Sequence, residues 1–327
     1  MEPPARIPRG RRSAHAPSWS IVLAAGDGAR LAPLTRLLYG RPVPKQFATL
    51  RGGSSLLQLT LERSERLAPP ERTIVVVPEA FAGTAEEQSR EFGECTLLAQ
   101  PRNAGTGPGI LLPLAHLLRQ SPDASVVVLP SDHHFARPDA FIGRLEQARA
   151  MLGQIRSGVC LVAVDAESPA TDYGWIVPQD AAAARRGWSP IVRFVEKPDP
   201  ALARALHAER AVWNTFVIVA RAAALWRLAA RWLPRQADLV RAASAMTSLR
   251  EIYRRMPPAN FSHEVLARAS GIGVVTVANA GWTDLGTPER VFEILAGSAD
   301  RDALLARCGL PPSPGAWHEL AARMIAR

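Results

Sequence analysis

Lysine is almost absent from this chain of 327 residues. The sequence holds 39 Lys and Arg residues, yet only Lys45 and Lys197 are lysines. Lysine is a compact charge on a flexible stem and arginine is a rigid planar fork, so the two are not interchangeable at a site. Both lysines lie beside proline, in Pro44-Lys45-Gln46-Phe47 and Glu196-Lys197-Pro198. We interpret them as functional; the alternative is two surface lysines in an arginine-biased chain.

Cysteine and long apolar runs are also scarce. Cys95, Cys160 and Cys308 lie far apart and lack metal-ligand spacing, which favours reduced thiols in the cytoplasm over a disulfide framework. No apolar run reaches the roughly 18 residues that span a bilayer, so we expect no membrane insertion. Residues 1–18 carry four arginines and four prolines but no apolar stretch. We expect a disordered basic arm there rather than a signal peptide.

The formal net charge of +9 suits an anionic ligand, such as a nucleic acid, an acidic membrane surface or a nucleotide. The arginines are scattered along the chain and form no stripe with interleaved aromatic residues. We therefore do not expect nucleic acid as a partner. An apolar content of 47% is sufficient for a large core, in one α/β domain with additions or in two domains.

Short apolar runs alternate with helical patterns over the first two-thirds of the chain. This alternation predicts βαβ units and a parallel sheet that is covered on both faces. Beyond residue 158 we expect continuation of the sheet together with a small substrate-facing subdomain. The predicted strands are 20–25, 73–77, 96–99, 125–129, 159–164, 174–177, 191–195, 212–219 and 273–277. The predicted helices are 55–67, 80–92 and 110–119, with one or two closing helices in 301–327.

A glycine-rich turn follows the first predicted strand. The segment Ala25-Gly26-Asp27-Gly28-Ala29-Arg30 would let the backbone approach a phosphate or a base closely. It lacks the third glycine of the dinucleotide fingerprint and the G-K-[ST] ending of a Walker loop. Instead, Arg30 follows at once and Lys45 comes after a loop rich in Pro and Arg. A glycine loop with two cations suits a triphosphate that is held during transfer, although a simple tight turn is the alternative.

These two segments resemble the signature of the sugar-1-phosphate nucleotidyltransferases. They are Leu23-Ala24-Ala25-Gly26-x-Gly28-x-Arg30-Leu31 and Pro44-Lys45-Gln46-Phe47, and the second is similar to the mannose-1-phosphate guanylyltransferase branch. Further segments follow in the order of that family, so the resemblance extends over roughly residues 19–295. These are Gln100-Pro101-Arg102-Asn103 with Thr106-Gly107-Pro108, Leu129-Pro130-Ser131-Asp132-His133, Tyr173-Gly174-Trp175-Ile176, Phe194-Val195-Glu196-Lys197-Pro198, Trp213-Asn214 and Trp282-Thr283-Asp284-Leu285-Gly286.

The resemblance implies a fold and a reaction. The fold would be the α/β nucleotidyltransferase fold, a Rossmann-like, mostly parallel mixed sheet with helices on both faces. The reaction would join a nucleoside triphosphate to a hexose 1-phosphate with Mg²⁺ as cofactor, with GTP and mannose 1-phosphate favoured. We expect a catalytic domain over 19–297 and a helical tail over 298–327, and a homodimer is compatible with this. The alternatives are another nucleotide or sugar, or a non-catalytic homologue that binds a nucleotide sugar and regulates a partner.

The resemblance also implies a role for each matching residue. Arg30 and Lys45 would hold the triphosphate, Asp132 and Asp284 would hold Mg²⁺, and Lys197 would meet the sugar phosphate. The implied catalytic residues are Arg30, Lys45, Asp132 and Lys197. The implied nucleotide-binding residues are Ala25, Gly26, Gly28, Gln100, Asn103, Thr106 and Gly107, and the implied sugar-binding residues are Gly174, Glu196, Lys197 and Asn214. Without the resemblance, either aspartate could be only a turn or cap residue, and Glu196-Lys197 could be a surface pair.

Several positions depart from the family pattern. Ala29 stands where a hydroxyl residue is usual, Ala32 replaces a tryptophan, and the loop over 36–45 is longer. The glycine that often follows the Asn-Thr pair is missing after Thr215. These departures affect loop shape, on which sugar and nucleoside specificity depend, and they remove no proposed charge. The sequence shows neither a strand-rich isomerase-like domain nor hexapeptide repeats, so we do not expect a bifunctional enzyme.

Overall fold

The computed structural model describes residues 16–243, 248–311, 313 and 315–325. The expected basic arm therefore lies outside the described residues, except for positions 16–18, and the first strand already begins at Ser18. Nine strands form the main sheet. In spatial order they are β5 (Thr96–Gln100), β4 (Thr73–Pro78), β1 (Ser18–Leu23), β6 (Ser125–Pro130), β11 (Val212–Arg221), β8 (Val159–Asp165), β12 (Gly273–Val277), β10 (Ser189–Glu196) and β9 (Gly174–Pro178).

The sheet is mixed, as expected, but the prediction that it is mostly parallel is wrong. The strands from β5 to β6 are parallel neighbours, and so are β8 and β12. The other pairings are antiparallel, and β9 pairs with both β10 and β11, so this end of the sheet closes on itself. Residues 179–188 are a short connection between β9 and β10, which favours an antiparallel pair. The segments that we expected in a substrate-facing subdomain are strands of this sheet.

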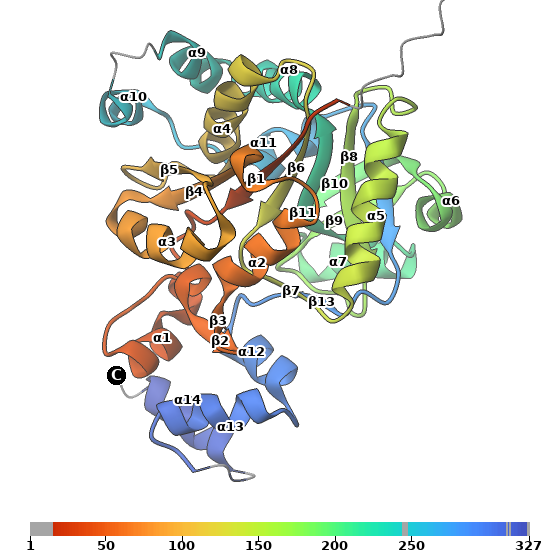
Figure 1. The fold of residues 1–327 in the computed structure, drawn as a ribbon. Helices are drawn as coiled ribbons and strands as arrows, with labels where there is room; N and C mark the ends of the chain where they lie inside the picture. The colour runs from red at the N-terminus through yellow and green to blue at the C-terminus, as the bar shows by residue number, and fades with distance from the viewer. Residues whose placement is uncertain (1–15, 244–247, 312, 314, 326–327) are drawn as a thin grey trace, which may run out of the picture.

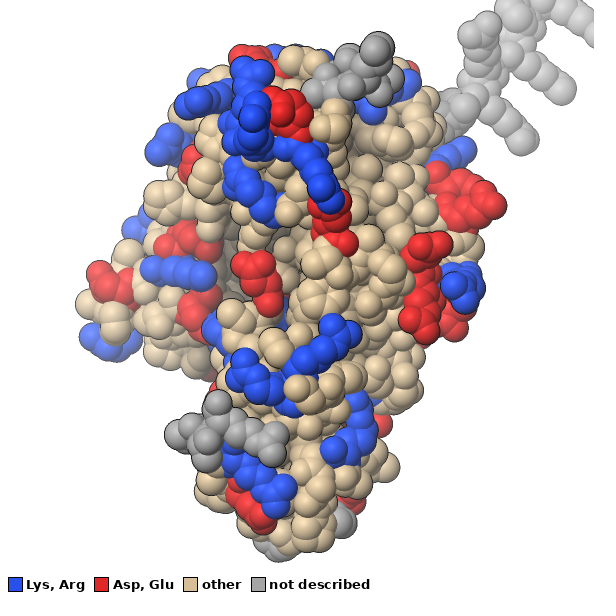
Figure 2. All heavy atoms as spheres, turned by 90° about the vertical axis from the view of Figure 1, so that its left-hand side faces the viewer, with Lys and Arg blue, Asp and Glu red and all other residues tan. Residues whose placement is uncertain are grey.

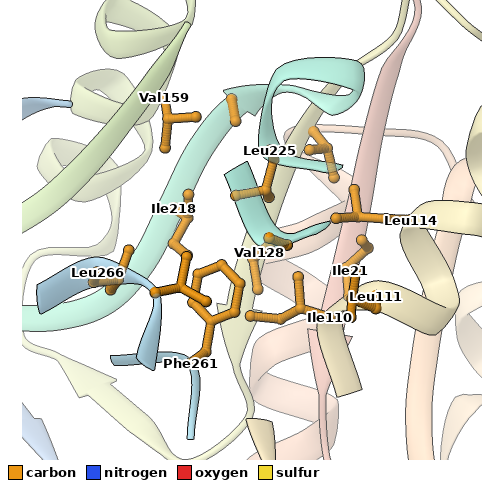
Figure 3. Close-up of a cluster of buried hydrophobic side chains, with 14 of the residues drawn as sticks. Ile21, Ile110, Leu111, Leu114, Val128, Val159, Ile218, Leu225, Phe261 and Leu266 are labelled. Carbon is orange, nitrogen blue, oxygen red and sulfur yellow. The ribbon is translucent and has the colours of Figure 1, made fainter. Parts of the chain in front are cut away.

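Helices cover both faces of the parallel half (Figure 1). Side chains alternate along β1, so Ile21 packs into one hydrophobic cluster and Val22 into another. The Ile21 cluster includes Ile110 and Leu114 of α4 (Thr106–Gln120) and Leu225 of α8 (Ala222–Trp232), as Figure 3 shows. The cluster on the other face includes side chains of α2 (Leu56–Glu65) and α3 (Ala82–Ser89). Burial on both faces explains the unbroken Val and Ile runs of the central strands.

The remaining elements flank this sheet or extend from it. No helix in the described part of the chain is both long and apolar enough to cross a bilayer. The remaining helices are α1 (Ala32–Tyr39), α5 (Pro138–Met151), α6 (Ala181–Arg186), α7 (Pro200–Ala208), α9 (Pro234–Ala242), α10 (Leu249–Arg255), α11 (Phe261–Glu264), α12 (Pro288–Leu295), α13 (Ala299–Arg307) and α14 (Ala316–Ile325). Two small ladders are formed by β2 (Thr49–Arg51) with β3 (Ser54–Ser55) and by β7 (His133–Phe135) with β13 (Trp282–Asp284).

The helices after residue 287 pack beside the segment that follows the first strand. Figure 1 shows α12, α13 and α14 in blue next to α1, β2 and β3 in red-orange. Leu31 and Leu34 share one buried cluster with Leu304, Leu305 and Leu320. In addition, the backbone N–H of Gly52 donates to Asp300 Oδ1 at 2.9 Å. This packing ties the two parts of the chain together.

Charge is mixed over the surface. On the face drawn in Figure 2, Lys and Arg side chains form separate groups with Asp and Glu side chains between them. Among the exposed ion pairs, Arg250 pairs with Glu79 and Arg254 with Glu251, each at 2.7 Å. At these two ion pairs the positive charge is balanced locally.

Candidate active site

A cavity of about 380 Å³ lies at the carboxyl ends of the parallel strands β1, β5 and β6. Two of these strand ends are joined, because the backbone N–H and the hydroxyl of Ser131 both donate to the Leu23 carbonyl, at 3.1 and 2.8 Å. Open α/β sheets bind ligands beyond such strand ends. The cavity is lined by Ala25, Gly26, Lys45, Gln100, Asn103, Thr106, Asp132 and Asp284, among others. All eight are residues that the sequence singles out.

Gln46 and Gly28 hold the glycine loop against the Lys45 segment. The side chain of Gln46 is buried, and its Nε2 donates to the carbonyls of Ala24 and Gly26 at 2.7 and 2.9 Å. Gly28 has φ +62°, and a Cβ there would lie 2.7 Å from the backbone nitrogen of Lys45. Only glycine suits that position. Gly28 therefore allows the glycine loop to pack against the Lys45 segment. It is not among the lining residues of the cavity.

Lys45 and Asp132 form an ion pair at the floor of the cavity, through Lys45 Nζ and Asp132 Oδ2. The side chains are only 14% and 23% exposed. Burial alone would raise the pKa of Asp132, but the charges of Lys45 and His133 and the hydrogen bond from Lys45 outweigh it. The pKa of Asp132 therefore lies well below its usual range, and the carboxylate is ionised at neutral pH.

Asp284 reaches the same cavity from the small ladder between β7 and β13. In this ladder the backbone of Asp284 lies opposite that of His133. The next residue, Leu285, donates its N–H to the Asp132 carbonyl at 2.9 Å. Burial raises the pKa of Asp284, partly opposed by the charges of Arg290 and Lys45. The ladder thus holds two carboxylates, from positions 132 and 284, at one cavity wall.

The donor set fits a hard divalent cation that shares its coordination with a substrate. Among the described residues there is no group of three or more His, Cys, Asp or Glu side chains arranged to hold a metal. An ion at Asp132 and Asp284 would therefore take further oxygens from phosphates and water. Mg²⁺ is commonly bound in this way, by one or two carboxylates plus substrate phosphates.

The far wall of the cavity is polar and comes from the segment after β5. Gln100 is 3% exposed, and its Nε2 has no hydrogen-bond partner among the described residues. Asn103 bridges two loops, donating to Asp27 Oδ2 and accepting from the Gly105 N–H, each at 2.8 Å. Thr106 accepts from the Phe261 N–H at 2.8 Å. The buried Gln100 amide is thus available to a ligand in the cavity.

Gly107, by contrast, is a packing residue at the start of α4. A Cβ at this position would lie 2.9 Å from the Cβ of Ala259. Its N–H donates to the Ala259 carbonyl at 2.9 Å. The structure does not bring Gly107 to the cavity wall.

A second cavity of about 190 Å³ adjoins the first, and Asp284 and Thr106 line both. Its other walls include Gly174, Glu196 and Asn214, the predicted sugar-binding residues. The three meet closely: a Cβ on Gly174 would lie 2.8 Å from Glu196 Oε2 and 3.3 Å from the Asn214 Cβ. Burial raises the pKa of Glu196, opposed by the charge of Lys197 and a hydrogen bond with Ser262.

Lys197 lies at the edge of this second cavity rather than in it. Its side chain is exposed, and it is not among the lining residues of either cavity. Its backbone has φ +48°, and its N–H donates to the Tyr173 carbonyl at 3.1 Å. The contact fixes the turn that follows Glu196.

Residues 19–301 match the family model described as Nucleotidyl transferase. The chain belongs to this family. The xanthan biosynthesis protein XanB of Xanthomonas campestris pv. campestris (strain B100) is 30% identical over 285 residues, which cover 84% of this chain and 58% of XanB. Mannose-1-phosphate guanylyltransferase of Escherichia coli (strain K12) is 28% identical over 297 residues, covering 86% and 60%. The chain thus spans about three-fifths of the length of these relatives.

Solved structures share the fold. A crystal structure described as mannose-1-phosphate geranyltransferase from Thermus thermophilus has a TM-score of 0.71 at 32% identity, covering 84% of this chain and 79% of the other. A structure described as mannose-6-phosphate isomerase from Helicobacter pylori has a TM-score of 0.65 at 19% identity, covering 82% and 100%. At that identity, the second likeness shows the fold alone.

The sequence prediction for this nucleotidyltransferase family member missed Arg290 and Asp172. Arg290 of α12 forms ion pairs with both Asp284 and Asp172, and its guanidinium lies 4.6 Å from the centre of the Tyr173 ring. Arg30, with a side chain 53% exposed, lies 3.5 Å from Asp284 and 3.8 Å from Asp172. The position of Asp172, just before the Tyr173-Gly174 segment, could have signalled its role. No sequence signal marked Arg290.

The adjacent histidines after Asp132 point in different directions, as expected of an extended segment. His133 is buried, packs edge-on against Trp282 at 5.2 Å and lines the larger cavity. His134 lies 3.3 Å from Arg51, away from that cavity. Burial lowers the pKa of each to about 4. Both are therefore neutral at pH 7, and His133 carries a charge next to Asp132 only in acid.

Proposed function

We propose that this protein is a nucleotidyltransferase that joins GTP and mannose 1-phosphate to give GDP-mannose and pyrophosphate. One observation carries the proposal: the two cavities meet at Asp284, next to the Lys45–Asp132 pair. A reaction between a nucleotide and a sugar phosphate needs this arrangement of two adjoining sites with charged groups at their junction. The names of two relatives support this choice of substrates. One is a mannose-1-phosphate guanylyltransferase, and the other is a xanthan biosynthesis protein.

The reaction is an in-line displacement at the α-phosphorus of the triphosphate. An oxygen of the sugar phosphate forms the new P–O bond, and the bond to the leaving pyrophosphate breaks. Because all reacting groups are anions, catalysis consists of positioning and charge neutralisation. Lys45 and Arg30 would bind the triphosphate and the developing pyrophosphate. Asp132 and Asp284 would hold Mg²⁺, which when bound neutralises phosphate charge.

The walls of the two cavities divide the recognition of the substrates. Gln100 and Asn103 would bind the nucleoside, since the buried Gln100 amide is free for a ligand. Glu196 and Asn214 would accept and donate hydrogen bonds to sugar hydroxyls. Lys197, at the rim, would meet the sugar phosphate as it enters. Its exposure leaves the flexible side chain free to reach toward that group.

Replacing Gly174 by alanine is expected to weaken sugar binding selectively. The new Cβ would lie 2.8 Å from Glu196 Oε2 and would displace that carboxylate. Loss of one well-placed hydrogen bond costs about 1.4 kcal/mol, so the KM for the sugar 1-phosphate should rise about tenfold. The KM for the nucleoside triphosphate should stay unchanged. Gly143→Ala is the control, because open space surrounds that helical glycine; an equal rise in both KM values would contradict the assignment.

Pyrophosphate release, measured with several nucleoside triphosphates against several sugar 1-phosphates, tests the whole proposal. The expected result is Mg²⁺-dependent release that is greatest for GTP with mannose 1-phosphate. Another preferred pair would keep the reaction and overturn the specificity. No release with any pair, together with retained binding of a nucleotide sugar, would favour the non-catalytic regulatory homologue.

A further inference from the structure

Arg290 bridges two acidic residues at the junction of the two cavities. One end of its guanidinium pairs with Asp284 Oδ1 and the other with Asp172 Oδ2. The Tyr173 ring lies against the guanidinium at 4.6 Å, and the Arg290 side chain is only 18% exposed. The guanidinium is thus held from three sides, by two carboxylates and an aromatic ring.

The two oxygens of Asp284 have different partners. Oδ1 accepts from Arg290 and from the Tyr173 hydroxyl, the latter at 3.1 Å. Oδ2 faces Arg30, whose Nη2 lies 3.5 Å away on a half-exposed side chain. At this distance and exposure Arg30 is a loose partner, which an incoming cation can displace with or without nucleotide. Oδ2 is then the oxygen available to a cation.

We propose that Arg290 is a positioning residue that turns Asp284 so that Oδ2 faces the cavity, and that it thereby sets the affinity for the divalent cation. Asp172 and Tyr173 complete the support by fixing the guanidinium. The inference rests on the proposed role of Asp284 as a metal ligand. Groups that orient a metal ligand from outside the coordination sphere change metal affinity by about 10–100-fold when they are replaced.

A purely electrostatic role for Arg290 would give the opposite result. A positive charge next to a metal ligand repels the cation, so its removal alone should strengthen metal binding. Orientation requires the planar fork, which lysine cannot supply even though it keeps the charge. Arg290→Lys and Arg290→Gln therefore separate the two roles.

The experiment is a titration with Mn²⁺, in which electron paramagnetic resonance measures the free ion, without nucleotide. We expect both Arg290→Lys and Arg290→Gln to bind Mn²⁺ at least about tenfold more weakly than the wild type. Glu289→Ala, an exposed neighbour on the same helix, should bind as the wild type does. Wild-type affinity in Arg290→Lys, or tighter binding in Arg290→Gln, would overturn the inference.

Two further measurements keep the outcomes distinct. Asp284→Asn should also lose Mn²⁺ affinity; if it does not, the proposed metal site itself fails. If Asp284→Asn loses affinity and Arg290→Lys does not, only the role of Arg290 fails. In turnover assays the apparent KM for Mg²⁺ should rise in the Arg290 variants, while kcat at saturating Mg²⁺ stays within about threefold of the wild type. A merely structural role would lower kcat and thermal stability without this selective change in KM.

Discussion

Asp132→Asn is expected to lower turnover by about 1,000-fold, which corresponds to roughly 4 kcal/mol of lost transition-state stabilisation. Asparagine keeps the shape of the side chain but removes the charge on which the proposed metal site depends. It also leaves Lys45 without its ionic partner in a largely buried position. We therefore expect a folded protein with a lower, still cooperative, thermal transition.

Steady-state pyrophosphate release and circular dichroism during heating measure these two effects. Asp139→Asn is a matched control, because that aspartate is 88% exposed and, among the described residues, pairs only with Arg66 on the surface. It should keep wild-type turnover. Mg²⁺-dependent turnover near the wild-type rate in Asp132→Asn would exclude Asp132 as a metal ligand.

Lys45→Arg should lower kcat on the order of 100-fold even though the charge is kept. The Lys45 side chain is 14% exposed and is confined by the Gly28 turn, where a Cβ would lie 3.4 Å from Lys45 Cγ. A longer, planar guanidinium cannot direct a single charge to the same point, whether toward Asp132 or toward a phosphate. The loss should appear in kcat at saturating substrates.

An arginine-to-lysine substitution on the same loop provides the control. Arg41 is exposed, and Arg41→Lys should leave kcat within about twofold of the wild type, as is usual for a surface substitution. Near-normal kcat in Lys45→Arg would mean that any cation suffices there. The scarcity of lysine would then reflect composition alone.

Much of the fold could be predicted from apolar runs. The runs at 73–77 and 125–129 predict central strands, and the structure has β4 at Thr73–Pro78 and β6 at Ser125–Pro130. The start of α4 was harder to predict, because its apolar pattern begins at Ile110 while the helix begins at Thr106. The antiparallel half of the sheet was harder to predict, since a burial pattern does not record strand direction and only a short connection, as between β9 and β10, indicates it.

The site residues likewise fall into a group that could be predicted from the sequence and a group that could not. The segments that contain Lys45, Asp132 and Asp284 follow one another in the order of the resembled family. They could therefore be predicted to share one end of the sheet. Arg290 could not, because a charged residue on a helix is ordinarily a solvated one. Its partners come from positions 172 and 284, and only the folded chain brings these together.

The contact between the segment from α1 to β3 and the helices after residue 298 has a consequence for folding during synthesis. Arg307 donates to the Thr49 carbonyl across 258 positions of sequence, and Gly52 donates to Asp300 across 248. At about 5–20 residues per second, the ribosome needs on the order of ten seconds to a minute to make that intervening chain. Until then the cluster around Leu34 holds early members such as Leu50 and Leu56 but lacks Leu304, Leu305 and Leu320. We therefore expect a nascent chain to close this cluster only after the α13 segment has left the ribosome.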